Sequence, residues 1–166
     1  DILNWMKEDL AAECRFTTMF DLYALPNDFP GYEQAAAISD PYAKVVALEA
    51  ALEADIASRF FFPYIQLHEF ETLILANPQC LDWEYLEHDS AIRNLVAMVG
   101  DQNPELINDG PETAPSKRVI KEIPEYEGDK TSGASVAAQI GLATLREKCA
   151  HFNEWVTRLE QLGSES

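Results

Sequence analysis

Two short apolar runs on either side of one well-marked helix constrain the fold of this chain most. Residues 16–22 and 60–67 are rich in β-branched and aromatic residues, which is typical of short buried strands. Between them, Asp40 and Pro41 form a capping residue followed by a proline, and apolar residues then recur at helical spacing. These apolar residues are Val45, Leu48, Leu52 and Ile56. The order strand, helix, strand predicts a parallel α/β unit.

The rest of the chain is expected to be mainly helical. Short helices are predicted at residues 72–76, 92–99 and 117–123, and residues 25–32 and 103–116 are rich in proline and other turn formers. Two apolar stripes near the C-terminus indicate further helices. The stripes are Val136, Ile140, Leu142 and Leu145, then Phe152, Trp155, Val156 and Leu159. We therefore expect an α/β fold in which a helical C-terminal layer follows the parallel strands.

The length of the chain predicts one domain over residues 1–166. A chain of 166 residues can bury one sizeable core without disulfides. The chain starts at Asp1 without a methionine, and Ile2, Leu3, Trp5 and Met6 already fall at helical spacing. We therefore expect an upstream segment to be missing.

The charge balance limits the partners. Twelve basic residues against 29 acidic ones give a net charge of −17, which repels polyanions, so nucleic acid is expected only at a local site. No apolar run reaches the roughly 18 to 20 residues that span a bilayer, so no membrane partner is expected. The three cysteines are far apart, which fits a reducing, cytoplasmic compartment better than a disulfide framework. The oligomeric state is not indicated.

Acidic residues follow both predicted strands. Asp21 lies near the end of the first, and His68-Glu69-Phe70-Glu71 directly follows the second. Open parallel sheets bind ligands beyond the carboxyl ends of their strands, so we expect Asp21 and Glu69 to share one site. Carboxylates beside an imidazole can hold Mg²⁺ or Mn²⁺ through oxygen. The alternative is structural: Asp21 caps a turn, Glu69 and Glu71 are solvated, and His68 is an ordinary buried histidine.

Other catalytic motifs are absent or incomplete. His68-Glu69 begins like a zinc-protease HExxH motif, but Thr72 stands where the second histidine must be. Residues 128–131 end like a phosphate-binding loop, but Asp129 replaces the glycine that precedes the lysine. Serine-hydrolase and dinucleotide-binding motifs do not occur. The sequence thus favours none of these classes.

The only local group of basic residues follows the long loop. Its members are Lys117, Arg118, Lys121 and Lys130. Ser116 or Thr113 is expected to cap the helix that begins near Lys117, and this helix start, with Lys117 and Arg118, would bind phosphate. In the alternative, Glu112 fills the helix start as an internal anion, or the basic residues pair with Glu112, Glu122 and Glu125.

Five strings of the sequence are long and distinctive: TTMFDLY (17–23), FPGY (29–32), YIQLHEFE (64–71), NDGPETAPSKR (108–118) and CAHFNEW (149–155). In these strings the sequence resembles a bacterial family, domain of unknown function 4276. The resemblance extends over nearly the whole chain. Residues 131–134 differ from relatives that have His-Gly-Pro at that place.

Members of that family look similar to Toprim-type domains. In those domains an N-terminal strand ends in a glutamate, and a later strand ends in Asp-x-Asp, and together they bind Mg²⁺ for phosphodiester chemistry. Asp21 matches the first aspartate, while Tyr23 replaces the second. No glutamate strand precedes Asp1, so we expect the chain to lack the N-terminal β-strand segment of the full family. The resemblance implies a Toprim-like, Rossmann-type sheet.

The expected function is therefore divalent-metal-dependent phosphodiester or phosphoryl chemistry of a nuclease-like kind. Asp21, Glu69 and Glu71 would hold Mg²⁺ or Mn²⁺, and His68 would orient a ligand or water. A second set, Ser116, Lys117 and Arg118, would contact phosphate. The alternative is a binding module without catalysis, such as the partner subunit of an ATPase in a defence or repair system, which the resemblance alone suggests.

Overall fold

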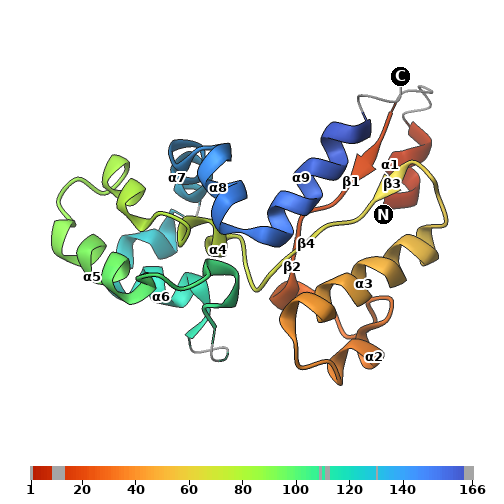
Figure 1. Ribbon diagram of the computed structural model, residues 1–166, viewed down its shortest axis with the longest axis horizontal. Coiled ribbons are helices and arrows are strands. Elements are labelled where there is room, and N and C mark those ends of the chain that lie inside the picture. Colours follow the sequence, from red (N-terminus) through yellow and green to blue (C-terminus); the bar gives the residue numbers. More distant parts are fainter. Residues whose placement is uncertain (1, 9–13, 109, 111–112, 130, 163–166) are drawn as a thin grey trace. The chain divides into compact units, whose positions relative to one another are not determined.

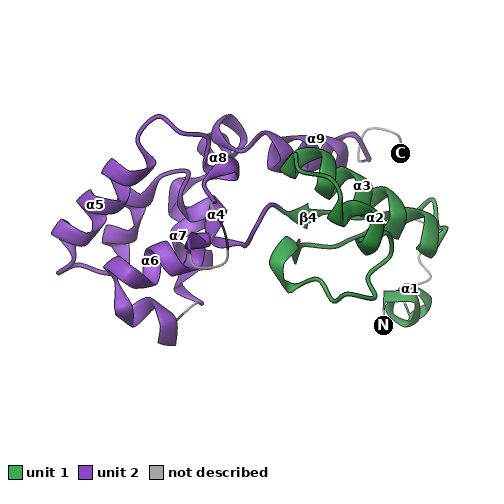
Figure 2. Cartoon of the chain, turned by 90° about the horizontal axis from the view of Figure 1, so that it is seen from below, with its two compact units in different colours: residues 1–66 green, residues 67–166 purple. Residues whose placement is uncertain are grey.

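The computed structural model describes residues 2–8, 14–108, 110, 113–129 and 131–162. The chain divides into two compact units, unit 1 over residues 1–66 and unit 2 over residues 67–166 (Figure 2). The single domain that the length suggests stays a prediction.

Unit 1 combines short strands with one long helix (Figure 1). Its elements in chain order are α1 (Ile2–Glu8), β1 (Phe16–Thr17), β2 (Phe20–Asp21), the 3-10 turn η1 (Leu22–Ala24), α2 (Tyr32–Ala36), α3 (Pro41–Ile56), β3 (Phe61–Phe62) and β4 (Ile65–Gln66). Both predicted strands are confirmed, each as two short pieces.

The regular elements in the described part of unit 2 are all α-helices or 3-10 turns. Its elements are α4 (Glu71–Ile74), η2 (Pro78–Trp83), α5 (Asp89–Val99), η3 (Pro104–Leu106), α6 (Pro115–Glu122), η5 (Pro124–Gly128), α7 (Ser132–Ile140), α8 (Leu142–Lys148) and α9 (Ala150–Leu162). The prediction of a mainly helical second half is confirmed. The protein is thus a mixed α/β chain in which helices dominate, and its Toprim-like, Rossmann-type identity stays a prediction.

The strands pair in parallel, as the strand-helix-strand order predicts. β1 lies beside β3 with Phe16 opposite Phe61, and β2 lies beside β4 with Asp21 opposite Gln66. Thr18 and Pro63 lie where the pairing breaks, because proline has no N–H to donate to a neighbouring strand.

The hydroxyl of Thr18 bridges this break. It accepts a hydrogen bond from the Tyr64 N–H at 3.0 Å and donates one to the Tyr64 carbonyl at 3.1 Å. Thr18 is buried, so these bonds satisfy backbone groups that water does not reach. One side chain therefore holds the two ladders in a common register.

α3 forms where its cap and apolar spacing predict it. Asp40 Oδ1 accepts a hydrogen bond from the Ala43 N–H at 2.7 Å, and Pro41 is the first helical residue. Val45, Leu48 and Leu52 are buried. On the same helix, Glu49 Oε1 accepts a hydrogen bond from the Ile65 N–H at 2.7 Å, which fastens α3 to β4.

Helix starts in unit 2 depart from the prediction. α6 begins at Pro115, two residues before the expected start, and Ala114 is its N-cap residue without a side-chain cap. The expectation that Ser116 or Thr113 caps this helix is therefore wrong, because Ser116 lies inside the first turn. Of the loop before it, Asp109, Pro111 and Glu112 lie outside the described residues.

The described ends of that loop are hydrogen-bonded. Gly110 N–H donates to Asn108 Oδ1 at 3.2 Å, and Thr113 N–H donates to the Gly110 carbonyl at 3.0 Å. Arg118 Nε donates to the Thr113 carbonyl at 2.7 Å.

Among the described residues, no helix has the length and apolar character that are needed to cross a membrane.

Candidate functional site

Asp21 lies at the carboxyl end of a parallel strand, as predicted. It is the last residue of β2 and precedes η1, at the kind of edge where parallel sheets bind ligands. Its carboxylate makes no capping hydrogen bond to η1. The alternative in which Asp21 serves as a turn cap is therefore wrong.

A cavity of about 460 Å³ adjoins Asp21. Its lining is otherwise apolar and comes from β2, η1 and the loop after them. The apolar lining includes Met19, Phe20, Leu25 and Phe29. Such a pocket, with one carboxylate among apolar walls, is of the size that small ligands occupy.

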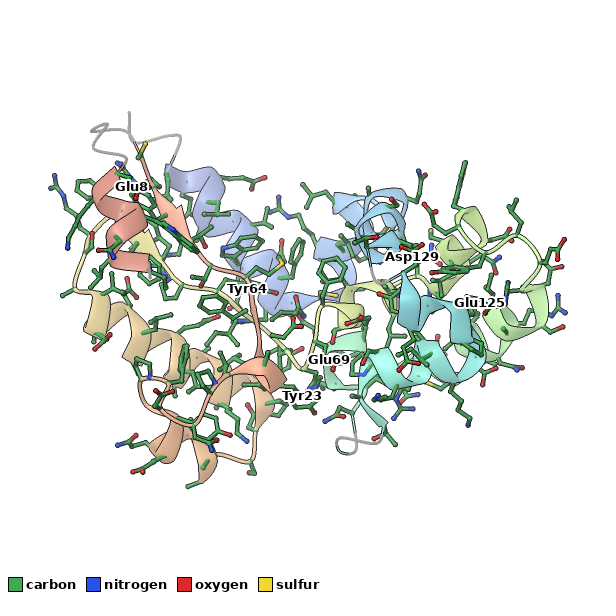
Figure 3. All side chains as sticks on the ribbon, turned by 180° about the vertical axis from the view of Figure 1, so that it is seen from behind. Glu8, Tyr23, Tyr64, Glu69, Glu125 and Asp129 are labelled. Carbon is green, nitrogen blue, oxygen red and sulfur yellow. The ribbon has the colours of Figure 1, made fainter. Side chains whose placement is uncertain are left out.

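Glu69 is the anion at the start of α6. Its Oε2 accepts a hydrogen bond from the Ser116 N–H at 2.9 Å (Figure 3). The first amides of a helix lack partners within the helix and carry partial positive charge, so a carboxylate stabilises them. The structure thus contains an internal anion at this helix start, but it is Glu69, while the expected Glu112 lies outside the described residues.

Replacing Glu69 by alanine should lower the free energy of unfolding by about 1 kcal/mol, the typical effect of losing an N-terminal cap. Chemical denaturation measures the change. Glu127→Ala removes an exposed acid from unit 2 and should leave the stability nearly unchanged. Equal effects of the two substitutions would contradict the capping role of Glu69.

Glu71 is buried and bonded to a tyrosine. Only 5% of its surface is exposed, and its Oε1 accepts a hydrogen bond from the Tyr126 hydroxyl at 3.1 Å. Burial, together with the nearby Glu71, raises the pKa of Tyr126 well above its ordinary value, so this hydroxyl stays protonated and donates. The structural alternative in which Glu71 is solvated is therefore wrong, while Glu69 is half-buried.

A second tyrosine extends this polar region. The rings of Tyr85 and Tyr126 meet edge to face with centroids 6.4 Å apart. Ser132 Oγ donates to the Asp129 carbonyl at 2.7 Å, so the Tyr85 hydroxyl, 2.8 Å from that Oγ, is the donor to it. Both tyrosines are thus held by buried polar groups.

His68 has an unusual backbone and a buried ring. Its φ is +60°, in the left-handed region that costs a non-glycine residue about 1 to 2 kcal/mol. Its Nε2 lies 3.0 Å from the Glu105 carbonyl, which can only accept, so Nε2 carries a proton. Burial lowers the pKa of His68, against opposite effects of the Glu105 carbonyl and Glu69. The ring is therefore neutral at neutral pH.

Glu105 has no exposed surface and holds the start of α9. Its Oε2 accepts from the His151 N–H and its Oε1 from the Phe152 N–H, each at 3.1 Å. Its own position is fixed because Asn103 Oδ1 accepts from the Glu105 N–H at 2.9 Å. Sequence reasoning missed Glu105. One signal was available. Cys149, directly before α9, is a poor capping residue, which indicates that a residue from elsewhere in the chain caps this helix.

Two of the acids that were expected to pair with the basic group have other partners. Glu122 Oε2 accepts from Asn94 Nδ2 at 2.8 Å, and Glu125 Oε2 lies 3.2 Å from His88 Nε2. Lys117 is exposed and Arg118 is half-buried, while Lys130 lies outside the described residues. Pairing of the basic residues with these acids stays a prediction, and so does phosphate binding by Ser116, Lys117 and Arg118.

The predicted metal ligands are divided between the units. Asp21 belongs to unit 1, and His68, Glu69 and Glu71 belong to unit 2. Within the described part of the chain, no group of three or more His, Cys, Asp or Glu side chains is arranged to hold a metal ion. The shared site of Asp21 and Glu69 stays a prediction.

The family model that matches residues 1–160 is described as Domain of unknown function (DUF4276). The chain belongs to this family. The resemblance seen in the TTMFDLY and YIQLHEFE strings is thereby confirmed. No curated protein and no solved structure matches this DUF4276 chain.

Proposed function

We propose that this DUF4276 protein carries out divalent-metal-dependent phosphodiester or phosphoryl chemistry, with Asp21 as a ligand of Mg²⁺ or Mn²⁺. The single observation that supports this most is the position of Asp21 at the carboxyl end of parallel strand β2, beside a cavity of about 460 Å³. Its carboxylate is not used to cap the turn that follows.

A site with few protein carboxylates is compatible with magnesium. Mg²⁺ usually keeps several waters and is held by one or two carboxylates together with substrate phosphates. A complete cage of protein ligands is therefore not needed. When bound, such a metal would stabilise negative charge on a phosphate or activate a water. Metal binding should be weak until a phosphate substrate contributes its own oxygens.

The acidic residues after β4 would have secondary roles. Glu69 uses Oε2 at the start of α6, and its Oε1 has no hydrogen bond within the described residues, so a second ligand role is open to it. Glu71 and His68 are buried and hydrogen-bonded, which suits fixing the segment between β4 and α4. Lys117 and Arg118 supply positive charge for a phosphate group.

The proposal predicts a metal-dependent activity that requires Asp21. Hydrolysis of a chromogenic phosphodiester and of short DNA strands would be measured with Mg²⁺, with Mn²⁺ and with a chelator. Asp21→Asn keeps the size of the side chain and removes its charge, and it should abolish turnover. Asp28→Asn is the matched control, because Asp28 is an exposed aspartate of the following loop. This variant should retain activity.

Three results would count against the proposal. They are turnover in the presence of the chelator, full turnover by Asp21→Asn, and tight zinc binding that survives Asp21→Ala in titration calorimetry. The last result would indicate nitrogen or sulfur ligands instead of carboxylate oxygen.

A binding module is the second candidate. Trp83 and Leu86 are 67% and 76% exposed on unit 2, and large exposed apolar side chains are common at protein interfaces. A partner such as an ATPase subunit would cover them. Two results together would favour this function over catalysis. The chain would show no turnover under any metal condition, and it would alter the rate of ATP hydrolysis by a partner. The Trp83→Ala variant would no longer alter that rate.

A further inference from the structure

A second cavity of unit 1 contains a lysine. It has a volume of about 290 Å³ and lies among η1, α2 and α3. We call it the Lys44 pocket. Its lining includes Tyr23, Tyr32, Ala35, Ala36, Lys44 and Leu48. Ala35 and Leu48 are buried, while Tyr23 is 42% exposed. Tyr23 is labelled in Figure 3. The pocket therefore has an apolar floor and an accessible aromatic side chain.

A glycine allows the helices that line the pocket to approach. Gly31 precedes α2 with φ +76°, and a Cβ added to it would lie 2.7 Å from the Cβ of Ala51 on α3. A side chain at residue 31 would thus force α2 away from α3. The pocket depends on this close contact.

Lys44 is half-buried at the pocket, and its ammonium group has no hydrogen bond or ion pair within the described residues. The acids nearest to it along α3 have other hydrogen-bond partners. Asp40 accepts from the Ala43 N–H, and Glu49 accepts from the Ile65 N–H. In a chain with a net charge of −17, a partly desolvated lysine without a carboxylate partner is unexpected.

The lining suggests what would compensate this charge. An ammonium group beside a cavity attracts a carboxylate or a phosphate. The two tyrosines and the apolar floor favour a flat apolar body, and tyrosine hydroxyls can bind its polar edge. The volume of about 290 Å³ lies just below the range of about 300 to 1,000 Å³ that is usual for ligand pockets. The ligand must therefore be small.

We propose that the Lys44 pocket binds a small organic anion that consists of one aromatic ring system and a carboxylate or phosphate group. The anion contacts Lys44, and the ring occupies the space between the tyrosines and Leu48. This inference does not rest on the proposed metal chemistry, because neither Asp21 nor a metal ion takes part in the binding. It gives unit 1 a ligand site of its own.

Ligand-detected NMR and titration calorimetry without divalent metal test the proposal with four probes. Phenyl phosphate and benzoate have both ring and charge, benzyl alcohol has the ring alone, and inorganic phosphate has the charge alone. We expect phenyl phosphate or benzoate to bind, and the tighter of the two identifies the anionic group. Benzyl alcohol and inorganic phosphate should each bind at least about 10-fold more weakly.

The variants separate charge from pocket shape. Lys44→Met keeps the apolar stem and should weaken binding about 10- to 100-fold, which corresponds to the loss of a charged hydrogen bond. Lys44→Arg should retain binding. Lys148→Met removes an exposed lysine of unit 2 with the same change in net charge, and should also retain it. Ala36→Leu narrows the pocket independently of Lys44 and should reduce binding.

Several results would overturn the proposal. They are no binding of either charged aromatic probe at millimolar concentration, equal binding of benzyl alcohol or inorganic phosphate, and unchanged affinity in Lys44→Met or in Ala36→Leu. Lys44 would then merely cover apolar surface with its stem. Asp21→Asn should bind the probes like the wild type, so a failure of the catalytic proposal leaves this one intact.

Discussion

Replacing Glu105 by alanine should lower the free energy of unfolding of the chain by about 2 to 5 kcal/mol, because two buried backbone donors lose their partner. The His151 and Phe152 N–H groups both donate to its carboxylate at 3.1 Å. Glu105 has no exposed surface, and both partner residues are buried, so water cannot replace the lost hydrogen bonds without a rearrangement. The negative charge also lies at the positive end of α9.

The effect should be local before it is global. Chemical denaturation gives the loss of stability, and hydrogen exchange should show faster exchange of the His151 and Phe152 amides in particular. Glu105→Gln keeps one acceptor and should have an intermediate effect. Glu154→Ala removes an exposed acid of α9 and should change stability by less than about 0.5 kcal/mol. A Glu105→Ala loss as small as that would contradict the capping role.

Replacing Gly133 by alanine should destabilise the chain by about 1 to 4 kcal/mol, although alanine is the better helix former. A Cβ at residue 133 would lie 2.7 Å from the Tyr126 hydroxyl oxygen and 3.4 Å from atoms of Ile74 and Phe70. The hydroxyl would have to move, and buried Glu71 would lose its donor. The gain in helix propensity, about 1 kcal/mol, is smaller than this combined loss.

A double-mutant cycle identifies the cause. Tyr126→Phe removes the oxygen that the new Cβ would meet, so Gly133→Ala should cost less in that background than in the wild type. Gly128→Ala is the matched control, because a Cβ there has no heavy atom within 4 Å. Denaturation midpoints of the four proteins and the control give the coupling. Additive effects would mean that the Tyr126 hydroxyl is not the atom that excludes a side chain.

The strands and α3 could be predicted because their signals are local. Runs of β-branched and aromatic residues marked both strands, and Asp40 with Pro41 marked the start of the helix. Parallel pairing followed from the helix between the strands. The position of Asp21 at the end of a strand could be predicted from the same local signals.

The helix starts of unit 2 could not be predicted from local signals. α6 and α9 follow Ala114 and Cys149, and their anions, Glu69 and Glu105, come from distant parts of the chain. Capping rules consider neighbours in sequence, whereas here tertiary packing supplies the partner. The burial of Glu71 could not be predicted for the same reason, since its partner Tyr126 is brought to it by folding.

The hydroxyl of Thr18 has a consequence for strand slippage. Sliding one strand past the other by a single residue would reverse the face on which every side chain of that strand lies. Ladders as short as β1–β3 and β2–β4 have few backbone bonds to resist this, and Pro63 removes one donor. The paired hydrogen bonds of Thr18 with the Tyr64 backbone form in the register in which Thr17 lies opposite Phe62 and Phe20 lies opposite Ile65, and a shift by one residue would break them. Thr18 thus favours the register in which Asp21 lies opposite Gln66.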